Sequence, residues 1–207
     1  MQRTVVLALG ANVSGPFGAP LSSLRHSVSR LSYCGLSLIS VSGIYRTAPI
    51  GGAKQPSYFN AVAIFRCPHP PRRLLRILKQ IESDFGRRRR GLNRPRPLDL
   101  DIIDATWPTV GWLRRIKRMD RPKSRGGSPS RERTTKGSLR LGSLRHRPHL
   151  MLPHPEAHRR RFVLEPLLEI APHWYHRGLR CSGRNLLARL PRRPGEIERT
   201  LDSLLQS

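Results

Sequence analysis

Cysteine and long apolar runs are both scarce in this sequence of 207 residues. The cysteines are Cys34, Cys67 and Cys181, and their odd number and wide spacing form neither a CxxC pair nor a disulfide framework. We therefore expect three reduced thiols, as is usual for a cytoplasmic protein. No apolar stretch approaches the roughly 20 residues that a membrane span needs, so no membrane association is expected.

The apolar start of the chain could be mistaken for a targeting segment. The run from Thr4 to Leu9 is shorter than the apolar part of a signal peptide, and Gly10, Ala11 and Asn12 follow it as a turn. We interpret the run as a buried first strand.

Acidic residues are also few. There are 13 Asp and Glu against 39 Lys and Arg, which gives a net charge of +26. This excess predicts attraction to polyanions, namely nucleotides, nucleic acid or anionic lipid, without choosing among them. Hydrophobic residues make up 37% of the chain, a low share for a compact fold, so we expect part of the chain to lie outside the core.

The segment from Trp107 to Arg147 has the composition expected of a part of the chain that lies outside the core. It carries thirteen Lys and Arg, only two acids and no hydrophobic period, which predicts a disordered basic insert at about 108–147 within one domain spanning 1–207. Two origins fit the insert: a loop that binds nucleic acid or acidic surfaces, or sequence never selected for folding. The absence of an aromatic or periodic pattern favours the second.

The hydrophobic pattern outside the insert predicts alternating strands and helices. Strands are expected near the N-terminus and over Leu36–Tyr45, Tyr58–Phe65 and Leu98–Ile103, and helices over 20–31, 74–85 (ended by Gly86) and Phe162–Ile170, with a start at Pro166 possible for the last. A final amphipathic stretch is expected over Glu196–Leu205. This order favours an α+β fold of the ferredoxin-like sandwich type, with one mostly antiparallel sheet and helices packed on one face.

The sharpest motif is the pair Asp99 and Asp101 in the sequence PRPLDLDII. In a strand, Leu98, Leu100 and Ile102 would face the core, and the two acids would project together on the other side, with Cα atoms about 6.6 Å apart. Two carboxylates so placed can hold two Mg²⁺ ions together with phosphates and water. Isolated, such a pair would be read as a solvated strand face, but its position beside an arginine cluster in a basic chain favours a metal site.

The arginine cluster surrounds that motif. It comprises Arg87–Arg90, Arg94 and Arg96, and guanidinium forks match phosphate oxygens. Opposite two metal ions the arginines could hold a triphosphate, although the run alone fits a solvated or nucleic-acid-binding surface equally well.

Two further segments suggest a ligand site more weakly. His154 lies between prolines, and a basic turn and Phe162 follow it, which hints at a nucleotide or aromatic ligand. Tyr58 and Asn60 share one face of a strand and could stack on and hydrogen-bond a flat heterocycle. Ordinary strand packing explains this second pair equally well.

Taken in order, these segments resemble the 6-hydroxymethyl-7,8-dihydropterin pyrophosphokinase family. The likeness runs through LGAN at residues 9–12, YRT at 45–47, NAV at 60–62, the PRPLDLDI block, LPH at 152–154 and FVL at 162–164. It covers the chain to about residue 175, apart from the insert, and the PRPLDLDI block is its most specific part.

The resemblance implies a reaction and a set of roles. ATP would donate its pyrophosphoryl group to the hydroxymethyl oxygen of the pterin and release AMP, with two Mg²⁺ on Asp99 and Asp101. Arg87 and Arg96 would contact the transferring phosphates. The ATP side would comprise Glu82, Arg89, Ile102, His154 and Arg160, and the pterin side Thr47, Ile50, Tyr58, Asn60 and Phe162.

The sequence also departs from the family. The loop around Gly91–Arg94 is brief and lacks an aromatic residue, which leaves the alignment of Arg89 open, and the basic insert replaces a much shorter connection. A catalytically disabled remnant and a basic RNA-binding module of similar sheet order are therefore kept as alternatives. The aromatic strand signature of RNA-recognition domains is missing. We expect a cytoplasmic monomer, with nonspecific nucleic-acid contact possible through the insert.

Overall fold

The computed structural model describes residues 3–49, 55–88, 94–107, 150–192 and 196–205. The predicted insert and two predicted site residues, Ile50 and Arg89, lie outside these ranges. None of the helices in these ranges combines the length and the apolar composition of a membrane-spanning segment.

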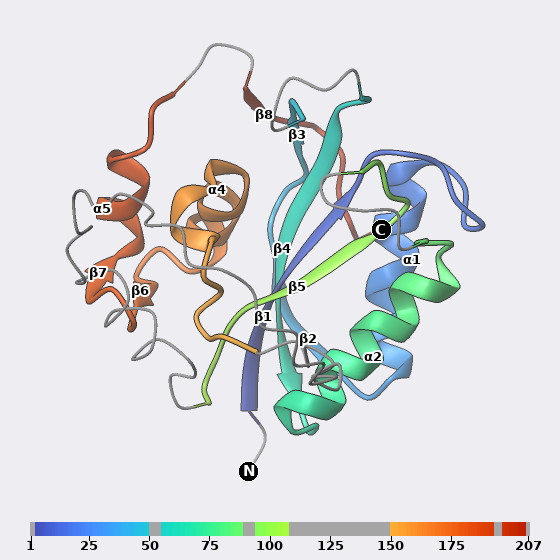
Figure 1. The fold of residues 1–207 in the computed structure, drawn as a ribbon, viewed down its shortest axis with the longest axis horizontal. Helices are drawn as coiled ribbons and strands as arrows, with labels where there is room; N and C mark the ends of the chain where they lie inside the picture. Colours follow the sequence, from blue (N-terminus) through green and yellow to red (C-terminus); the bar gives the residue numbers. More distant parts are fainter. Residues whose placement is uncertain (1–2, 50–54, 89–93, 108–149, 193–195, 206–207) are drawn as a thin grey trace, which may run out of the picture.

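A six-stranded sheet forms the centre of the fold (Figure 1). Its strand order is β5-β1-β4-β3-β8, β2 also pairs with β4, and every pairing is antiparallel. The strands are β1 (Arg3–Ala11), β2 (Ser37–Val41), β3 (Tyr45–Thr47), β4 (Tyr58–Cys67), β5 (Asp99–Ala105) and β8 (Ile197–Arg199). Two short strands, β6 (Tyr175–His176) and β7 (Cys181–Ser182), form a separate hairpin-like pair.

Helices cover both faces of the sheet, so the expectation of helices on one face was wrong (Figure 1). The helices α1 (Pro20–Tyr33) and α2 (Pro71–Asp84) pack on one face, and the short 3₁₀ helix η1 (Ala157–Arg159), α4 (Arg161–Ile170) and α5 (Gly183–Ala188) lie on the other side. Alternation along β1 serves both layers: Val5, Leu7 and Leu9 belong to the larger core, and Val6 belongs to the smaller core beneath α4.

Most predicted elements are confirmed, and three differ. The predicted strand Leu36–Tyr45 is two strands, β2 and β3, because the Ser42 hydroxyl takes the place of a backbone partner and accepts from Val62 N at 3.0 Å. The helix near Phe162 begins at Arg161, with Pro166 inside it, rather than at Pro166. The predicted amphipathic stretch Glu196–Leu205 begins with the strand β8.

Two local features position the loop that carries the arginines. Gly86 ends α2 with a φ of 83°, as predicted from its place after the helical stripe. Gly15, in the loop after β1, lies so close that an added Cβ would meet Pro97 Cβ at 2.6 Å and the Phe85 carbonyl oxygen at 2.9 Å. The β1–α1 loop is therefore packed directly against both arms of the arginine-bearing loop.

Candidate functional site

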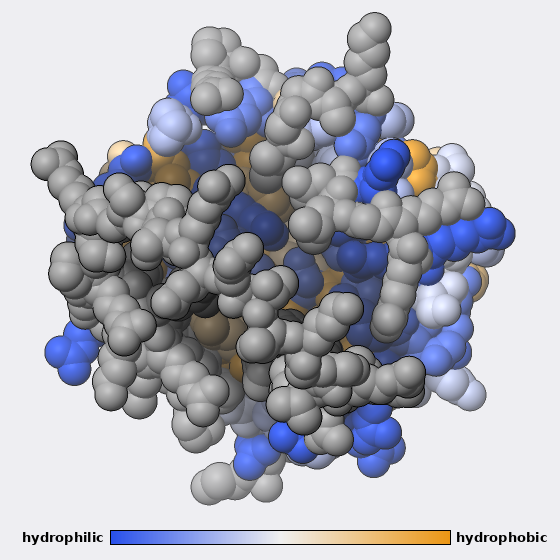
Figure 2. Space-filling view, viewed as in Figure 1, coloured by the Kyte–Doolittle hydropathy of each residue, from blue (hydrophilic) through white to orange (hydrophobic). Residues whose placement is uncertain are grey.

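A cavity of about 310 Å³ opens where β1, β4 and β5 meet the start of α4. In the space-filling view, which has the orientation of Figure 1, hydrophilic side chains lie around apolar ones near the middle of the visible face (Figure 2). The lining residues come from distant parts of the chain: Ala8, Leu9, Gly10, Thr47, Ala48, Gln55, Tyr58, Asn60, Ala61, Arg87, Arg96, Asp99, Asp101, Ile103, His154, Arg160, Phe162 and Val163.

The acidic pair lies on the floor of this cavity. Asp99 and Asp101 alternate with buried Leu98, Leu100 and Ile102, as the sequence pattern predicted. Across the ladder, Asp99 pairs with Gly10. A Cβ at Gly10 would lie 3.0 Å from Asn60 Oδ1. The absence of a side chain at Gly10 therefore leaves the cavity open between the acids of β5 and the polar face of β4.

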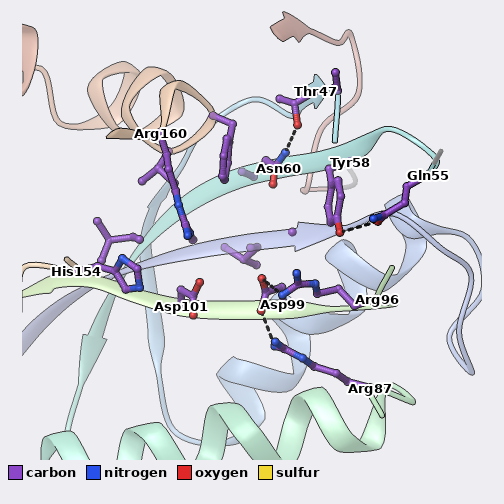
Figure 3. A pocket seen from close by; sticks show the side chains of 18 residues that line it. Thr47, Gln55, Tyr58, Asn60, Arg87, Arg96, Asp99, Asp101, His154 and Arg160 are labelled. Atoms are coloured by element: carbon purple, nitrogen blue, oxygen red, sulfur yellow. Dashed lines mark hydrogen bonds and ion pairs between the residues drawn. The ribbon is translucent and has the colours of Figure 1, made fainter. Parts of the chain in front are cut away.

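Two arginines hold Asp99 from opposite sides (Figure 3). Arg87 donates to Asp99 Oδ1, and Arg96 donates to Asp99 Oδ2 at 2.9 Å. Burial alone would lower the pKa of the Arg96 guanidinium, but the negative charge of Asp99 and the contact with Tyr58 outweigh burial and raise it. Both oxygens of Asp99 are thus engaged by groups that could equally bind phosphate.

Glu82 stands behind this pair rather than in the cavity. Its carboxylate is 2% exposed and accepts hydrogen bonds from Leu100 N at 2.8 Å, from Lys79 and from Arg87. Burial is the largest influence on this group and raises the pKa of Glu82. Its position therefore ties α2 to β5 and orients Arg87, and its predicted contact with ATP stays a prediction.

The opposite wall is polar and aromatic. Thr47 Oγ1 accepts from Asn60 Nδ2 at 2.8 Å, and Tyr58 reaches Gln55 and the Arg94 carbonyl with its hydroxyl at 3.5 and 3.4 Å. Figure 3 shows these side chains across the cavity from Asp99 and Asp101. A flat ligand placed here would have aromatic and carboxamide partners beside it, with the acids and arginines at its far end.

Arg160 enters the cavity from the start of α4, and His154 lies beside Asp101 next to β5 (Figure 3). The His154 backbone N–H donates to the Ile103 carbonyl at 2.7 Å, which fixes this segment against β5. Burial lowers the pKa of His154, and the neighbouring Asp101 only partly offsets this. The imidazole is therefore favoured in its neutral form, in which one ring nitrogen accepts a hydrogen bond.

The structure brings most of the predicted site residues together. Of the predicted ATP-side residues, Ile102 is 4% exposed and packs in the larger core, while its neighbour Ile103 lines the cavity. Contact between Ile102 and ATP stays a prediction that this burial does not favour.

Asn12 forms part of the site, although the sequence indicated it only as a turn residue and as the last residue of the LGAN segment. Its side chain is 2% exposed, accepts from Arg96 N at 2.8 Å through Oδ1 and donates to the Pro56 carbonyl at 3.2 Å through Nδ2. Its own N–H donates to the Arg96 carbonyl at 3.1 Å. Asn12 thereby joins the arginine-bearing segment to the segment that leads into Tyr58. The available signal was an asparagine directly after a buried strand.

Replacement of Asn12 separates these two ties. For a reaction that takes place in this cavity, we expect Asn12→Ala to lower kcat about tenfold or more, because Arg96 N and the Pro56 carbonyl lose a buried partner. Asn12→Asp keeps the acceptor for Arg96 N, although it loses the donor to the Pro56 carbonyl and adds a carboxylate charge, and we expect it to retain more of kcat than alanine does. Steady-state kinetics with each substrate varied in turn would measure this. Equal kcat values for the two variants would contradict the assignment of separate ties.

Comparison with known proteins gives a consistent result. The family model for 7,8-dihydro-6-hydroxymethylpterin-pyrophosphokinase matches residues 6–172. The 2-amino-4-hydroxy-6-hydroxymethyldihydropteridine pyrophosphokinase of Haemophilus influenzae is 30% identical over 168 residues, covering 81% of each chain. The protein of the same name from Mycobacterium tuberculosis is 33% identical over 169 residues, covering 81% of this chain and 72% of the relative.

Longer relatives contain a similar part. The mitochondrial folate synthesis bifunctional protein of Arabidopsis thaliana is 27% identical over 191 residues, and the match spans 88% of this chain but only 27% of that protein. The crystal structure of Plasmodium falciparum HPPK-DHPS with pteroate aligns with a TM-score of 0.57 at 13% identity, covering 91% of this chain and 44% of that one. This structural likeness supports the fold alone.

Proposed function

Because the chain belongs to the 7,8-dihydro-6-hydroxymethylpterin-pyrophosphokinase family, we propose that it transfers the pyrophosphoryl group of ATP to the hydroxymethyl oxygen of 6-hydroxymethyl-7,8-dihydropterin and releases AMP. This is a step of folate biosynthesis. The observation that carries the proposal is the cavity itself, in which two carboxylates, Arg87 and Arg96 face a wall of Thr47, Tyr58 and Asn60, and Arg160 enters from the start of α4.

The donor set fits magnesium with phosphate. Among the described residues there is no cluster of three or more His, Cys, Asp and Glu that could hold a metal by protein ligands alone. Mg²⁺ retains waters and shares phosphate oxygens, so two carboxylates on one face are a sufficient protein contribution. Asp99 and Asp101 would hold two Mg²⁺, which when bound would neutralise charge on the phosphates.

The residues of the chain would act mainly by placement and charge. Attack by the pterin hydroxyl requires in-line positioning more than a strong base. Arg87 and Arg96 would move from Asp99 to the transferring phosphates, and His154 and Arg160 would bind the rest of ATP together with Glu82, Arg89 and Ile102. Tyr58 and Phe162 would stack on the pterin, and Thr47, Ile50 and Asn60 would complete its pocket.

The finer fold class and the domain boundaries belong to the same proposal. We propose a ferredoxin-like sandwich: the first 105 residues have the order β-α-β-β-β-α-β, in which β2 and β3 pair with successive parts of β4 and together take the place of one strand of that fold. We also propose one domain over 1–207, interrupted by a basic insert at about 108–147. Trp107 and Leu150 both pack against the larger core, which supports a chain that leaves and re-enters one unit. A cytoplasmic monomer, with nonspecific nucleic-acid contact through the insert, remains part of this proposal.

One assay separates the candidate functions. Purified protein with ATP, Mg²⁺ and 6-hydroxymethyl-7,8-dihydropterin should form AMP, and omission of the pterin or of Mg²⁺ should abolish it. A disabled remnant would bind ATP without forming AMP. An RNA-binding module would do neither, and helices on both sheet faces leave no open sheet for stacked bases among the described residues.

A further inference from the structure

The C-terminal residues 196–205, here called the tail, form part of the sheet although the family match ends at residue 172. Within the tail, β8 pairs with β3 in the register Tyr45↔Arg199 and Thr47↔Ile197. The pairing continues on both sides, because Ala48 N donates to the Glu196 carbonyl at 3.2 Å and Thr200 N donates to the Ile44 carbonyl at 2.8 Å. The tail therefore covers the outer edge of the strand that leads to Thr47 (Figure 1).

The tail is anchored at its far end in the main core. Leu204 is 4% exposed and belongs to the larger core, whereas its neighbour Leu205 is 53% exposed. Arg25 of α1 donates to the Ser203 carbonyl at 2.9 Å through Nε. Displacement of Leu204 would therefore release the end of the tail without touching the cavity.

A second tie joins the tail to α4. Arg199 donates to Glu169 Oε1 at 2.9 Å, and Glu169 also accepts from the Tyr45 hydroxyl at 2.9 Å and from Gly43 N at 3.1 Å. Burial and Glu169 raise the pKa of Tyr45 to about 12, so its hydroxyl keeps the proton that it donates. Through Glu169 the tail is connected to the helix that begins beside Phe162.

The contacts of the tail hold the end of the site that contains Thr47. Thr47 is 5% exposed and holds Asn60 by a hydrogen bond, so its position depends on how firmly β3 is held. The tail residues Glu196 and Ile197 also line a smaller cavity of about 100 Å³ that shares Thr47, Ala48, Arg160 and Phe162 with the main one. Without the tail, β3 would be a three-residue edge strand with unpaired backbone groups, which frays readily.

We propose that the tail is a positioning element for the pterin end of the site: it fixes Thr47 and Ala48 and so sets pterin affinity, while ATP affinity does not depend on it. The arginines and carboxylates that would bind the transferring phosphates and the metal ions lie on Arg87–Asp101, at the other side of the cavity. Of the described residues assigned to ATP, Arg160 alone also lines the smaller cavity. The proposal rests on the proposed function.

Leu204 and Leu205 provide a matched pair for the test. Leu204→Asp places a charge in the core and should detach the tail, whereas Leu205→Asp makes the same chemical change on the surface. With a non-hydrolysable ATP analogue bound, calorimetry should give a pterin Kd about tenfold weaker for Leu204→Asp than for the wild type. The Kd of the analogue should stay within about twofold, and Leu205→Asp should match the wild type in both.

A second variant acts on the strand itself and protects the test against a general loss of folding. Glu198 lies opposite Arg46 in the ladder, between the backbone hydrogen bonds that the tail makes with Ala48 and Ile44. Proline at this position removes a ladder hydrogen bond while leaving Leu204 in place. Glu198→Pro should reproduce the selective loss of pterin affinity.

The outcomes separate the two proposals. Loss of thermal stability with an unchanged pterin Kd in both variants would reduce the tail to a structural role and overturn the inference. Equal weakening of pterin and nucleotide would also overturn it. Failure of the wild-type protein to bind the pterin or form AMP would instead reject the proposed function.

Discussion

Asp101→Asn is expected to lower kcat by about 10²–10³-fold, with an unchanged melting temperature. The Asp101 carboxylate is in the cavity and half-buried, and no ion pair to it is seen among the described residues, so its loss should not disturb the packing. In the proposed site, the Asp101→Asn substitution removes one carboxylate ligand for Mg²⁺ and leaves the shape of the side chain intact. AMP formation at saturating substrates measures the effect on kcat.

Binding measurements test the same assignment without turnover. Titration of Mg²⁺ into the protein with a non-hydrolysable ATP analogue should give weaker metal binding for Asp101→Asn than for the wild type. Asp84→Asn is the matched control, because Asp84 lies on α2 and pairs with Arg30 outside the cavity. Near-native turnover of Asp101→Asn at saturating Mg²⁺ would disprove the role of Asp101 as a metal ligand.

Arg96→Lys should have the second large effect, a fall in kcat of about 10²-fold with little change in ATP affinity. Lysine keeps the charge but loses the planar fork that can bind two phosphate oxygens at once. The guanidinium already bonds to Asp99 at 2.9 Å, beside the acidic pair, so it is placed to follow the phosphates as they transfer.

Arg30 provides the control for Arg96→Lys. Arg30→Lys makes the same change in a surface pair with Asp84 and should leave kcat and ATP affinity as in the wild type. If Arg96→Lys weakens ATP binding and leaves kcat intact, Arg96 would be a binding residue without a share in the transferring step.

The acidic half of the site could be predicted because its signal is local. Leu98, Leu100 and Ile102 alternate with Asp99 and Asp101, and a buried strand of period two places these groups on opposite faces whatever the rest of the chain does. Gly86 was likewise predictable, since a helix that ends in a left-handed residue favours glycine.

The features that were missed depend on partners far away in the sequence. Asn12 bonds to Pro56 and Arg96, which are 44 and 84 residues away, so its local setting indicated only a turn. The Glu196–Leu205 segment could be read as amphipathic, but β3 supplies a strand partner about 150 residues earlier. The helix α4 packs on the second sheet face because its apolar side chains meet Val62 of β4 and Ile103 of β5. The periodicity of each strand does not show which helix will cover these two residues.

The two ion pairs that Asp99 makes with Arg87 and Arg96 have a thermodynamic consequence. While the arginines occupy both carboxylate oxygens, a cation must compete with two guanidinium groups for that ligand. A polyanion that draws the arginines away releases the carboxylate, and by linkage a cation on the carboxylate releases the arginines for the polyanion. On the proposed assignment, Mg²⁺ and triphosphate are therefore positively cooperative ligands of one electrostatic exchange, and each should raise the affinity for the other by the same factor.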